Sequence, residues 1–309
     1  MLSIFKREFS LMGCRFDITL VSKNEQKANN LIDEAIEEMR RIEYLLSEWK
    51  IDTPVSLVNK NAGLSPVKVP LELLQITNRA LQFSKMTEGA FDITMAGLNH
   101  IWKYDGSMKK IPSKAELQEA IKYVGYKNIC IEQDKRTIFL AQKGMRIGFG
   151  SIGKAYAADC AKELLVQKGV TAGIVNASGD MAIWGKQPDG TPWTGGIINP
   201  LNKEKLFAKF PVHNGAVVTS GTYEKYTVIN GKKYSHIIDP RTGMPTAEIA
   251  SVTVFAPTAE LANGLSTSIV IMGIEVGLHF INQIRGVSCV IVDNNAKIFT
   301  SNNIKIDKI

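Results

Sequence analysis

The chain has 309 residues, of which 45% are apolar, and its 37 Lys and Arg residues exceed its 30 Asp and Glu residues to give a formal charge of +7. This composition excludes a disordered or fibrous chain and provides enough apolar residues for a large core. Because no run of Lys or Arg exceeds two residues, the modest basic excess favours anionic small molecules over nucleic acid as ligands.

The first half of the chain switches between strand and helix patterns. Residues 14–21 alternate like a strand, and residues 24–50 place apolar side chains every three or four positions, which predicts an amphipathic helix. A second helix is predicted over residues 71–87. A third begins at Ser113, which has a glutamate three residues later as in a capping box, and ends at Gly125.

The second half surrounds two predicted helices, residues 154–168 and 258–272, with short β-rich runs. These runs are residues 137–141, 171–177, 216–220, 251–255, 288–293 and 298–301. Because the strands follow one another without strict βαβ alternation, the pattern indicates a compact α+β fold with a largely antiparallel sheet. No linker marks a boundary, so we expect one domain over residues 1–309, or two intimately packed lobes.

The cysteines and the N-terminal residues bear on the compartment. Four cysteines occur singly, without the spacing of a zinc or redox site, so a disulfide scaffold is not expected. The first residues contain no apolar run of seven or more before a small-residue cleavage site, and no stretch of 18 apolar residues occurs. We therefore expect a chain that does not span a membrane and is cytoplasmic, or an exported chain whose signal has been removed.

The first candidate site is the G-x-G-x-x-G segment at residues 148–153, which precedes a predicted helix. Glycines at this spacing let the backbone approach phosphate oxygens, and a helix start offers unpaired N–H groups. Lys154 adds a cation in the first turn. An ordinary tight turn is the alternative. A Rossmann unit is disfavoured because the next strand ends in NASGD, residues 176–180, and not in a lone acid.

The second candidate is the pair Asn263 and Thr267, which lie four residues apart on a predicted helix and therefore share a face. Two oxygen-bearing side chains one turn apart fit Mg²⁺, which prefers oxygen ligands. The alternative is that both side chains form only local hydrogen bonds within the helix.

The third candidate is a turn rich in Pro and Gly at residues 234–245, which carries His236, Asp239 and Arg241. Three ionisable groups within six positions exceed what an ordinary turn requires. The Asp-Pro and Thr-Gly pairs of this segment would also form a turn with no catalytic role.

Two loops give weaker signals. Residues 219–223 place three hydroxyl groups before a tyrosine, and residues 89–94 (GAFDIT) follow the second helix at a glycine. Hydroxyls and backbone amides on such loops commonly hold phosphate groups or the polar edges of rings. Ordinary surface turns are the alternative for both.

Taken together and in chain order, eight segments resemble the ApbE family of Mg²⁺-dependent FAD:protein FMN transferases. They are residues 12–13, 47–49, 89–94, 150–159, 176–180, 219–221, 236–245 and 262–273. The resemblance covers almost the whole chain and implies a T-fold-like architecture of antiparallel sheets flanked by helices. It also implies an enzyme that binds FAD and, with Mg²⁺, transfers FMN to a Thr or Ser hydroxyl of an acceptor protein, releasing AMP.

The resemblance also implies which residues contact FAD. These are Met12, Trp49, Ala90, Phe91, Asp92, Gly148, Lys154, Thr219, Ser220, His236 and Ile237. Among them, Trp49 offers a flat apolar face to an aromatic ring of the dinucleotide.

The metal and the catalytic groups follow from the same resemblance. Ser151, through its backbone carbonyl, would hold Mg²⁺ together with Asn263 and Thr267, where the ion offsets charge on the leaving phosphate. His236 would act as the general base or position a phosphate. Asp239 and Arg241 are expected to be its catalytic neighbours.

Two positions depart from the family pattern in a way that affects charge. Asn263 and Gly148 both stand where the family typically has Asp, so two carboxylates near the metal and the nucleotide are missing. A milder change is Ser-Gly-Asp at residues 178–180, where a double glycine is usual. A neutral amide ligates Mg²⁺ without the attraction of a full charge, so weaker metal binding is expected.

Three other functions remain open from the sequence. A non-catalytic protein on the same pocket would bind FAD without consuming it. An FAD pyrophosphatase would use water in place of the acceptor hydroxyl. An NAD(P)-dependent oxidoreductase would follow if the segment at residues 148–153 were a true dinucleotide fingerprint.

Overall fold

The computed structural model describes residues 1–98, 100–199 and 202–304. The helices are α1 (Glu25–Leu46), α2 (Pro54–Lys60), α3 (Leu71–Met86), η1 (Ile93–Leu98), α4 (Lys114–Ile121), η2 (Tyr126–Asn128), α5 (Ile152–Gln167), α6 (Ala259–Met272) and α7 (Ile274–Ile281). The strands are β1 (Ser3–Leu11), β2 (Cys14–Ser22), β3 (Val67–Lys68), β4 (Ile129–Glu132), β5 (Thr137–Leu140), β6 (Gly173–Ala177), β7 (Asp180–Trp184), β8 (Trp193–Asn199), β9 (Asn202–Val212), β10 (Gly215–Gly221), β11 (Tyr226–Ile229), β12 (Lys232–Ser235), β13 (Ile249–Ala256), β14 (Ser288–Asp293) and β15 (Ile298–Thr300).

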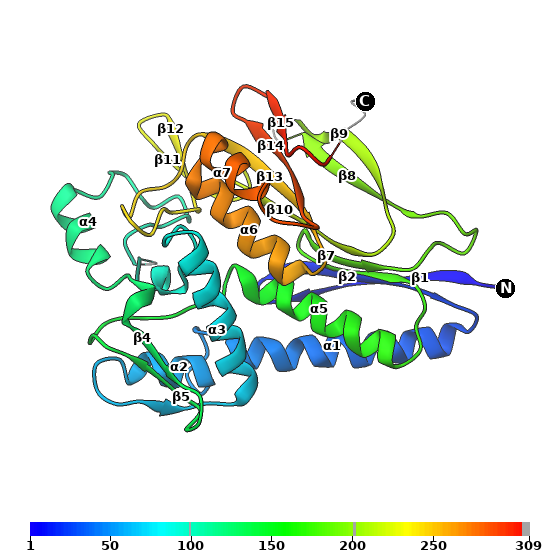
Figure 1. Ribbon diagram of the computed structural model, residues 1–309, viewed down its shortest axis with the longest axis horizontal. Helices are drawn as coiled ribbons and strands as arrows, with labels where there is room; N and C mark the ends of the chain where they lie inside the picture. The colour runs from blue at the N-terminus through cyan, green and yellow to red at the C-terminus, as the bar shows by residue number, and fades with distance from the viewer. Residues whose placement is uncertain (99, 200–201, 305–309) are drawn as a thin grey trace.

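An eight-stranded sheet in the order β1-β2-β6-β7-β10-β13-β14-β15 organises the molecule (Figure 1). Every neighbouring pair in it is antiparallel, which confirms the predicted α+β class. Each predicted β-rich run contains a strand, whereas β1, β3, β4, β7, β11 and the β8–β9 hairpin were not predicted. Since β5 precedes α5 and belongs to a different sheet from β6, residues 148–153 are not part of a Rossmann βαβ unit.

The helix boundaries follow from capping groups. Asn24 accepts a hydrogen bond from the backbone of the first turn of α1. The helix ends at Leu46, four residues before the predicted end, because Ser47 turns to an extended conformation and its Oγ accepts from the next backbone N–H groups. The predicted capping box of Ser113 is confirmed, but α4 ends at Ile121, before the predicted stop at Gly125.

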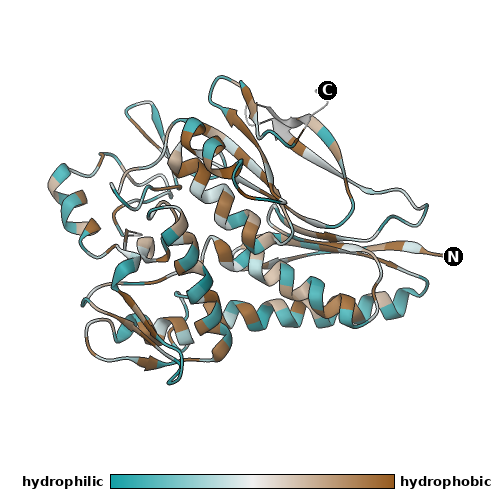
Figure 2. Cartoon of the chain, viewed as in Figure 1, coloured by the Kyte–Doolittle hydropathy of each residue, from teal (hydrophilic) through white to brown (hydrophobic). Residues whose placement is uncertain are grey.

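Three helices cover one face of the large sheet. In Figure 1, α1 and α5 run side by side beneath the strands, and α6 crosses near β10 and β13, as their contacts require. Figure 2 shows apolar and polar residues alternating along these helices, and the buried stripe of α1 includes Ile32, Ala35, Met39 and Ile42. No helix among residues 1–98, 100–199 and 202–304 is both long and apolar enough to cross a bilayer.

Two smaller apolar groups position the remaining loops. On the other face of the sheet, Trp193 of β8 and Val212 of β9 pack with Val217 of β10. Away from the sheet, Trp102 packs with Ile229 and Ile238, so the segment after η1 supports the β11–β12 hairpin and the turn that follows it. This second group fixes the surroundings of His236.

Candidate functional site

Oxygen-bearing side chains from three elements meet at the start of α5. Ser151, the residue before α5, donates from Oγ to Asn263 Oδ1 at 2.7 Å and lies 3.1 Å from Thr267 Oγ1. At the end of β10, Ser220 Oγ lies 2.8 Å from Ser266 Oγ and 3.5 Å from Thr267 Oγ1. We call these five residues the oxygen cluster. It brings together the three residues predicted to hold metal.

The donor set of the oxygen cluster fits a hard divalent cation. It consists of hydroxyl groups and one amide oxygen, which are ligands that Mg²⁺ accepts. The same atoms now hydrogen-bond to one another, so an ion among them would replace those bonds. The resemblance implied the backbone carbonyl of Ser151 as a ligand, whereas the structure also brings its hydroxyl to Asn263 and Thr267. The metal assignment itself stays a prediction.

Asp180 adds a buried carboxylate that the sequence analysis gave no role. It is the first residue of β7 and is only 4% exposed, and its Oδ2 accepts a hydrogen bond from Asn263 Nδ2 at 3.2 Å. Burial raises the pKa of Asp180 to about 7, although the charge of Lys154 opposes this shift. The signal in the sequence was an acid at the head of an otherwise apolar strand, DMAIW.

Lys154 lies in the first turn of α5 and supplies positive charge to this region. Its Nζ donates to the carbonyl of Gly150 at 2.8 Å. Its charge acts on two groups, because it lowers the pKa of Asp180 and also that of His236. The structure therefore places a lysine, a carboxylate and an imidazole from three distant segments in one electrostatic environment.

His236 is held in a defined tautomer. Its Nδ1 lies 3.0 Å from the carbonyl oxygen of Lys225, which only accepts, so Nδ1 carries the proton and Nε2 keeps its lone pair. The ring packs edge-on against Tyr104, with centroids 6.5 Å apart. Burial lowers the pKa of His236, and the charges of Lys154 and Lys225 act in the same direction. A neutral imidazole with a free Nε2 can accept a proton near neutral pH.

Asp239 and Arg241 pair with each other and not with His236. Two guanidinium nitrogens of Arg241 each lie 2.9 Å from a carboxylate oxygen of Asp239, and the backbone N–H of Arg241 donates to the same carboxylate. The bonded neighbour of His236 is instead the Lys225 carbonyl. The carboxylate of Asp239 therefore closes its own turn, and its adjacency to His236 stays a prediction. The catalytic role of the two residues stays a prediction.

Thr219 and Ser220 point to opposite faces of the sheet, because neighbouring residues of a strand alternate. Ser220 reaches the oxygen cluster, whereas Thr219 Oγ1 pairs with Thr253 Oγ1 at 2.9 Å across β10 and β13. The prediction grouped both hydroxyls as FAD contacts. The structure brings only Ser220 to the cluster.

The segment 90–92 is buried and its acid is engaged within the fold. Ala90 and Phe91 are 0% and 3% exposed. Asp92 accepts from the backbone and hydroxyl of Thr94 and from the backbone of Tyr126. Burial raises the pKa of Asp92, which these hydrogen bonds oppose. A contact of this segment with FAD would therefore come from its backbone.

Glu43 links the segment of Met12 to the segment after α1. Met12 sits in the β1–β2 turn with φ 50°, and its N–H donates to Glu43 Oε1 at 2.9 Å. Glu43 also pairs with Lys50 at 2.8 Å, beside Trp49. Trp49 is 74% exposed, so its ring is available for stacking. Ile237, by contrast, is buried, and its backbone is bonded to Ser235 and Thr246.

Gly148 lies against the end of α1. Its N–H donates to the carbonyl of Ile93 at 2.9 Å. A Cβ atom built on Gly148 would lie 2.5 Å from Glu48 Oε1 and 2.9 Å from Ala96 Cβ. The position therefore requires glycine as long as the other two side chains remain, and sequence reasoning did not single out Glu48.

An open cleft of about 650 Å³ lies at the opposite end of the central strands, where Gly215 begins β10 and Ala256 ends β13. It is lined by Lys162 and His213, among others, and by none of the predicted site residues. The predicted chemistry belongs to the other end of β10, at Ser220.

The fold and the site together define a class of protein. An oxygen cluster beside a lysine, a buried carboxylate and a neutral histidine has the composition of a site for phosphoryl chemistry with a divalent cation. The sequence profile of the ApbE family matches residues 12–291. The chain belongs to the ApbE family.

Individual relatives agree with this assignment. The chain is 29% identical over 274 residues to the FAD:protein FMN transferase of Salmonella typhimurium, covering 87% of this chain and 78% of that protein. It is 28% identical to one from Klebsiella pneumoniae, with 94% and 90% covered. The crystal structure of the ApbE protein of Thermotoga maritima superposes with a TM-score of 0.90 at 29% identity, covering 97% of both chains. The flavin transferase ApbE of Vibrio cholerae shares the fold, with a TM-score of 0.85 at 24% identity and 98% of both chains covered.

Proposed function

We propose that this protein is an FAD:protein FMN transferase that moves the FMN portion of FAD onto a Thr or Ser hydroxyl of an acceptor protein. One observation carries the proposal: residues far apart in the chain, Ser151, Asp180 and Asn263, are joined by hydrogen bonds beside Lys154. The names of the relatives support the same activity.

In the proposed reaction, the acceptor hydroxyl oxygen attacks the phosphorus of the FMN portion. A new P–O bond forms to the acceptor, the P–O bond to the bridging oxygen breaks, and AMP leaves with that oxygen. The hydroxyl proton passes to a base, for which His236 Nε2 is suited because Nδ1 is already protonated. The lowered pKa of His236 keeps the ring neutral before the reaction.

The other groups would bind and orient the dinucleotide. Lys154 would attract the pyrophosphate, and Trp49 would stack against a ring of the nucleotide. Ser151, Asn263 and Thr267 would hold Mg²⁺, which when bound offsets negative charge on the phosphates. Asp180 would fix the orientation of the Asn263 amide and add negative charge near the ion.

The test is incubation of the purified protein with FAD, Mg²⁺ and protein fractions of the source organism. Mass spectrometry of the proteins and chromatography of the nucleotides are then compared. An FMN-sized addition to a Thr or Ser, with one AMP released per addition, supports the proposal. Release of FMN and AMP without a protein adduct identifies a pyrophosphatase. Binding of FAD without any consumption identifies a non-catalytic flavin protein. Either of the last two results refutes transfer.

A further inference from the structure

The space beside Gly148 is filled by a carboxylate from another part of the chain. Glu48 follows the end of α1 and is 9% exposed, and its Oε1 and Cδ would lie 2.5 and 2.8 Å from a Cβ atom at position 148. Non-bonded heavy atoms do not approach this closely, so a side chain at 148 and the present Glu48 conformation exclude each other. Ala96 restricts the same space, at 2.9 Å.

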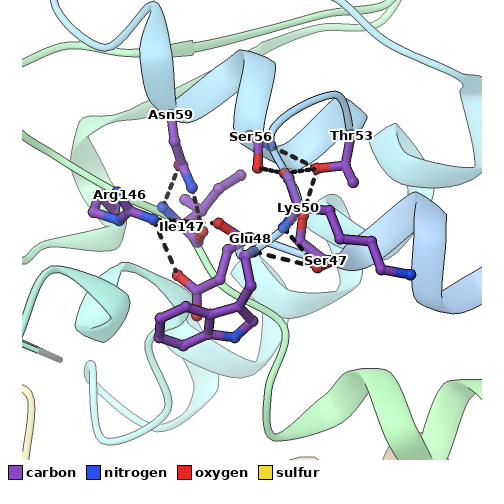
Figure 3. A network of polar contacts seen from close by, with 9 residues as sticks. Ser47, Glu48, Lys50, Thr53, Ser56, Asn59, Arg146 and Ile147 are labelled. Carbon is purple, nitrogen blue, oxygen red and sulfur yellow. Dashed lines mark hydrogen bonds and ion pairs between the residues drawn. The ribbon is translucent and has the colours of Figure 1, made fainter. Parts of the chain in front are cut away.

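Position 148 cannot move away from Glu48, because its backbone is held from both sides. Asn59 of α2 bonds both backbone groups of Ile147, donating to its carbonyl at 2.9 Å and accepting from its N–H at 2.7 Å (Figure 3). On the other side, the N–H of Gly148 donates to Ile93. Steric conflict must therefore be resolved by the side chains.

Hydrogen bonds in the turn at residues 47–53 fix the backbone of Glu48 beside Gly148. Ser47 Oγ accepts from the N–H groups of Trp49 and Lys50, and Thr53 Oγ1 donates to the Ser47 carbonyl (Figure 3). This tight turn sends the side chain of Glu48 inward while Trp49 stays exposed.

Arg146 is a charged neighbour of Glu48. Arg146 Nη2 lies 3.9 Å from Glu48 Oε2, which is a long ion pair, and donates to the Glu48 backbone carbonyl at 3.4 Å. Burial raises the pKa of Glu48 to about 7, and Arg146 opposes the shift. A hydrogen bond donated by a ligand to this carboxylate would favour its charged form and oppose the effect of burial.

We propose that Glu48 supplies to the nucleotide pocket the carboxylate that position 148 lacks, and that it accepts a hydrogen bond from an N–H or O–H group of bound FAD. This rests on the proposed function, because FAD is the ligand. The carboxylate reaches the space at Gly148 from the turn after α1 instead of from the segment before α5. Glu48 precedes Trp49 in the chain, and Gly148 precedes Ser151 and Lys154.

The first test measures FAD binding by flavin fluorescence, without turnover. Glu48→Ala and the isosteric Glu48→Gln are compared with Glu37→Ala, which removes an exposed acid of α1. Loss of a hydrogen bond to a charged acceptor predicts that the Kd for FAD rises about tenfold or more in Glu48→Ala, with a smaller rise in Glu48→Gln and no change in Glu37→Ala. Thermal melting of each variant separates lost binding from lost folding.

The second test moves the carboxylate back to position 148. Gly148→Asp alone is expected to bind FAD more weakly and to melt at a lower temperature, because Glu48 and Ala96 obstruct the new side chain. Combined with Glu48→Ala and Ala96→Gly, the same Asp has room and is expected to bring the Kd to within about threefold of the parent. The double variant Glu48→Ala/Ala96→Gly, which lacks the Asp, is the control and stays weak.

The outcomes separate this inference from the proposed function. A parent protein that binds no FAD overturns both. A parent that binds FAD, with Glu48→Ala and Glu48→Gln binding equally well, overturns the inference alone. A folded triple variant that binds no better than its double-variant control also overturns it, because the carboxylate would then have no role that position 148 can take over.

Discussion

The metal assignment is tested most directly by Asn263→Asp. In the present chain the Asn263 amide donates to the buried Asp180 carboxylate at 3.2 Å and accepts from Ser151 at 2.7 Å. The substitution replaces that donor with a second carboxylate, so the variant loses a hydrogen bond and places two acids side by side. A cation between them would relieve the conflict. The variant is therefore expected to be less stable without Mg²⁺ and to gain more stability from Mg²⁺ than the parent.

The magnitude follows from the geometry. Two unit charges 3.2 Å apart repel by about 5 kcal/mol at an effective dielectric constant of about 20, which is a ceiling because one acid can retain a proton. The lost hydrogen bond to a charged group is worth about 1.5–3 kcal/mol. We expect the metal-free variant to be destabilised by about 2 kcal/mol, which lowers the melting temperature of a chain of this size by about 3 °C.

The assay is thermal melting in EDTA and in increasing Mg²⁺, without FAD, followed by the Mg²⁺ dependence of FAD turnover. Asn263→Ala removes the amide without adding charge, so its melting temperature should respond to Mg²⁺ less than that of Asn263→Asp. Thr267→Val removes one oxygen and should raise the Mg²⁺ needed for half-maximal turnover. If Asn263→Asp melts like the parent in EDTA, or if Mg²⁺ shifts both proteins equally, the oxygen cluster does not hold the ion.

Three further predictions use other parts of the structure. His236→Ala should lower FMN transfer by about 100-fold or more with little change in the Kd for FAD; equal losses in both would make His236 a binding residue only. The carboxylate of Asp159 in α5 accepts hydrogen bonds from the backbone N–H groups of Ala259 and Glu260 in the first turn of α6. Asp159→Ala should therefore reduce the free energy of unfolding by about 1–3 kcal/mol in denaturant titrations. An unchanged denaturation midpoint would contradict this prediction. Burial raises the pKa of Glu48 from 4.5 to about 7, so its contribution to the free energy of unfolding is complete below about pH 4.5 and is lost as the pH rises through about 7. Between pH 5 and 8 the free energy of unfolding of the FAD-free parent should therefore fall by about 2–3 kcal/mol relative to that of Glu48→Gln. Parallel pH profiles of the two proteins would refute the assignment.

The elements with a clear period or cap could be predicted from the sequence. The stripe of α1, the capping box of α4 and the strands of the second half follow from local patterns. By contrast, β8 and β9 form a hairpin whose burial depends on the far face of the sheet, through Trp193 and Val212. A local pattern cannot show what a segment packs against. The early end of α1 was missed because the hydroxyl of Ser47 ends the helix although the apolar spacing continues.

The site shows the same division between local and distant information. The spacing of Asn263 and Thr267 predicted that they share a helix face. Their hydrogen bonds to Ser151, however, depend on how α5 and α6 pack, which the sequence does not show. Asp180 was missed because its importance comes from a partner 83 residues away. The expectation that Asp239 neighbours His236 came from the resemblance; what the sequence could not show is that each side chain is hydrogen-bonded to another partner, Lys225 for His236 and Arg241 for Asp239.

The resemblance implies carboxylates at positions 263 and 148, and an acid from elsewhere in the chain packs against each of these positions. Beside Asn263 lies Asp180, which is bonded to its amide, and beside Gly148 lies Glu48, which fills the volume of the missing side chain. Burial raises the pKa of both acids to about 7, so both would gain from a cation or a hydrogen-bond donor in the pocket. The acidic character of the site is therefore a property of the folded arrangement, and a comparison of single positions along the sequence underestimates it.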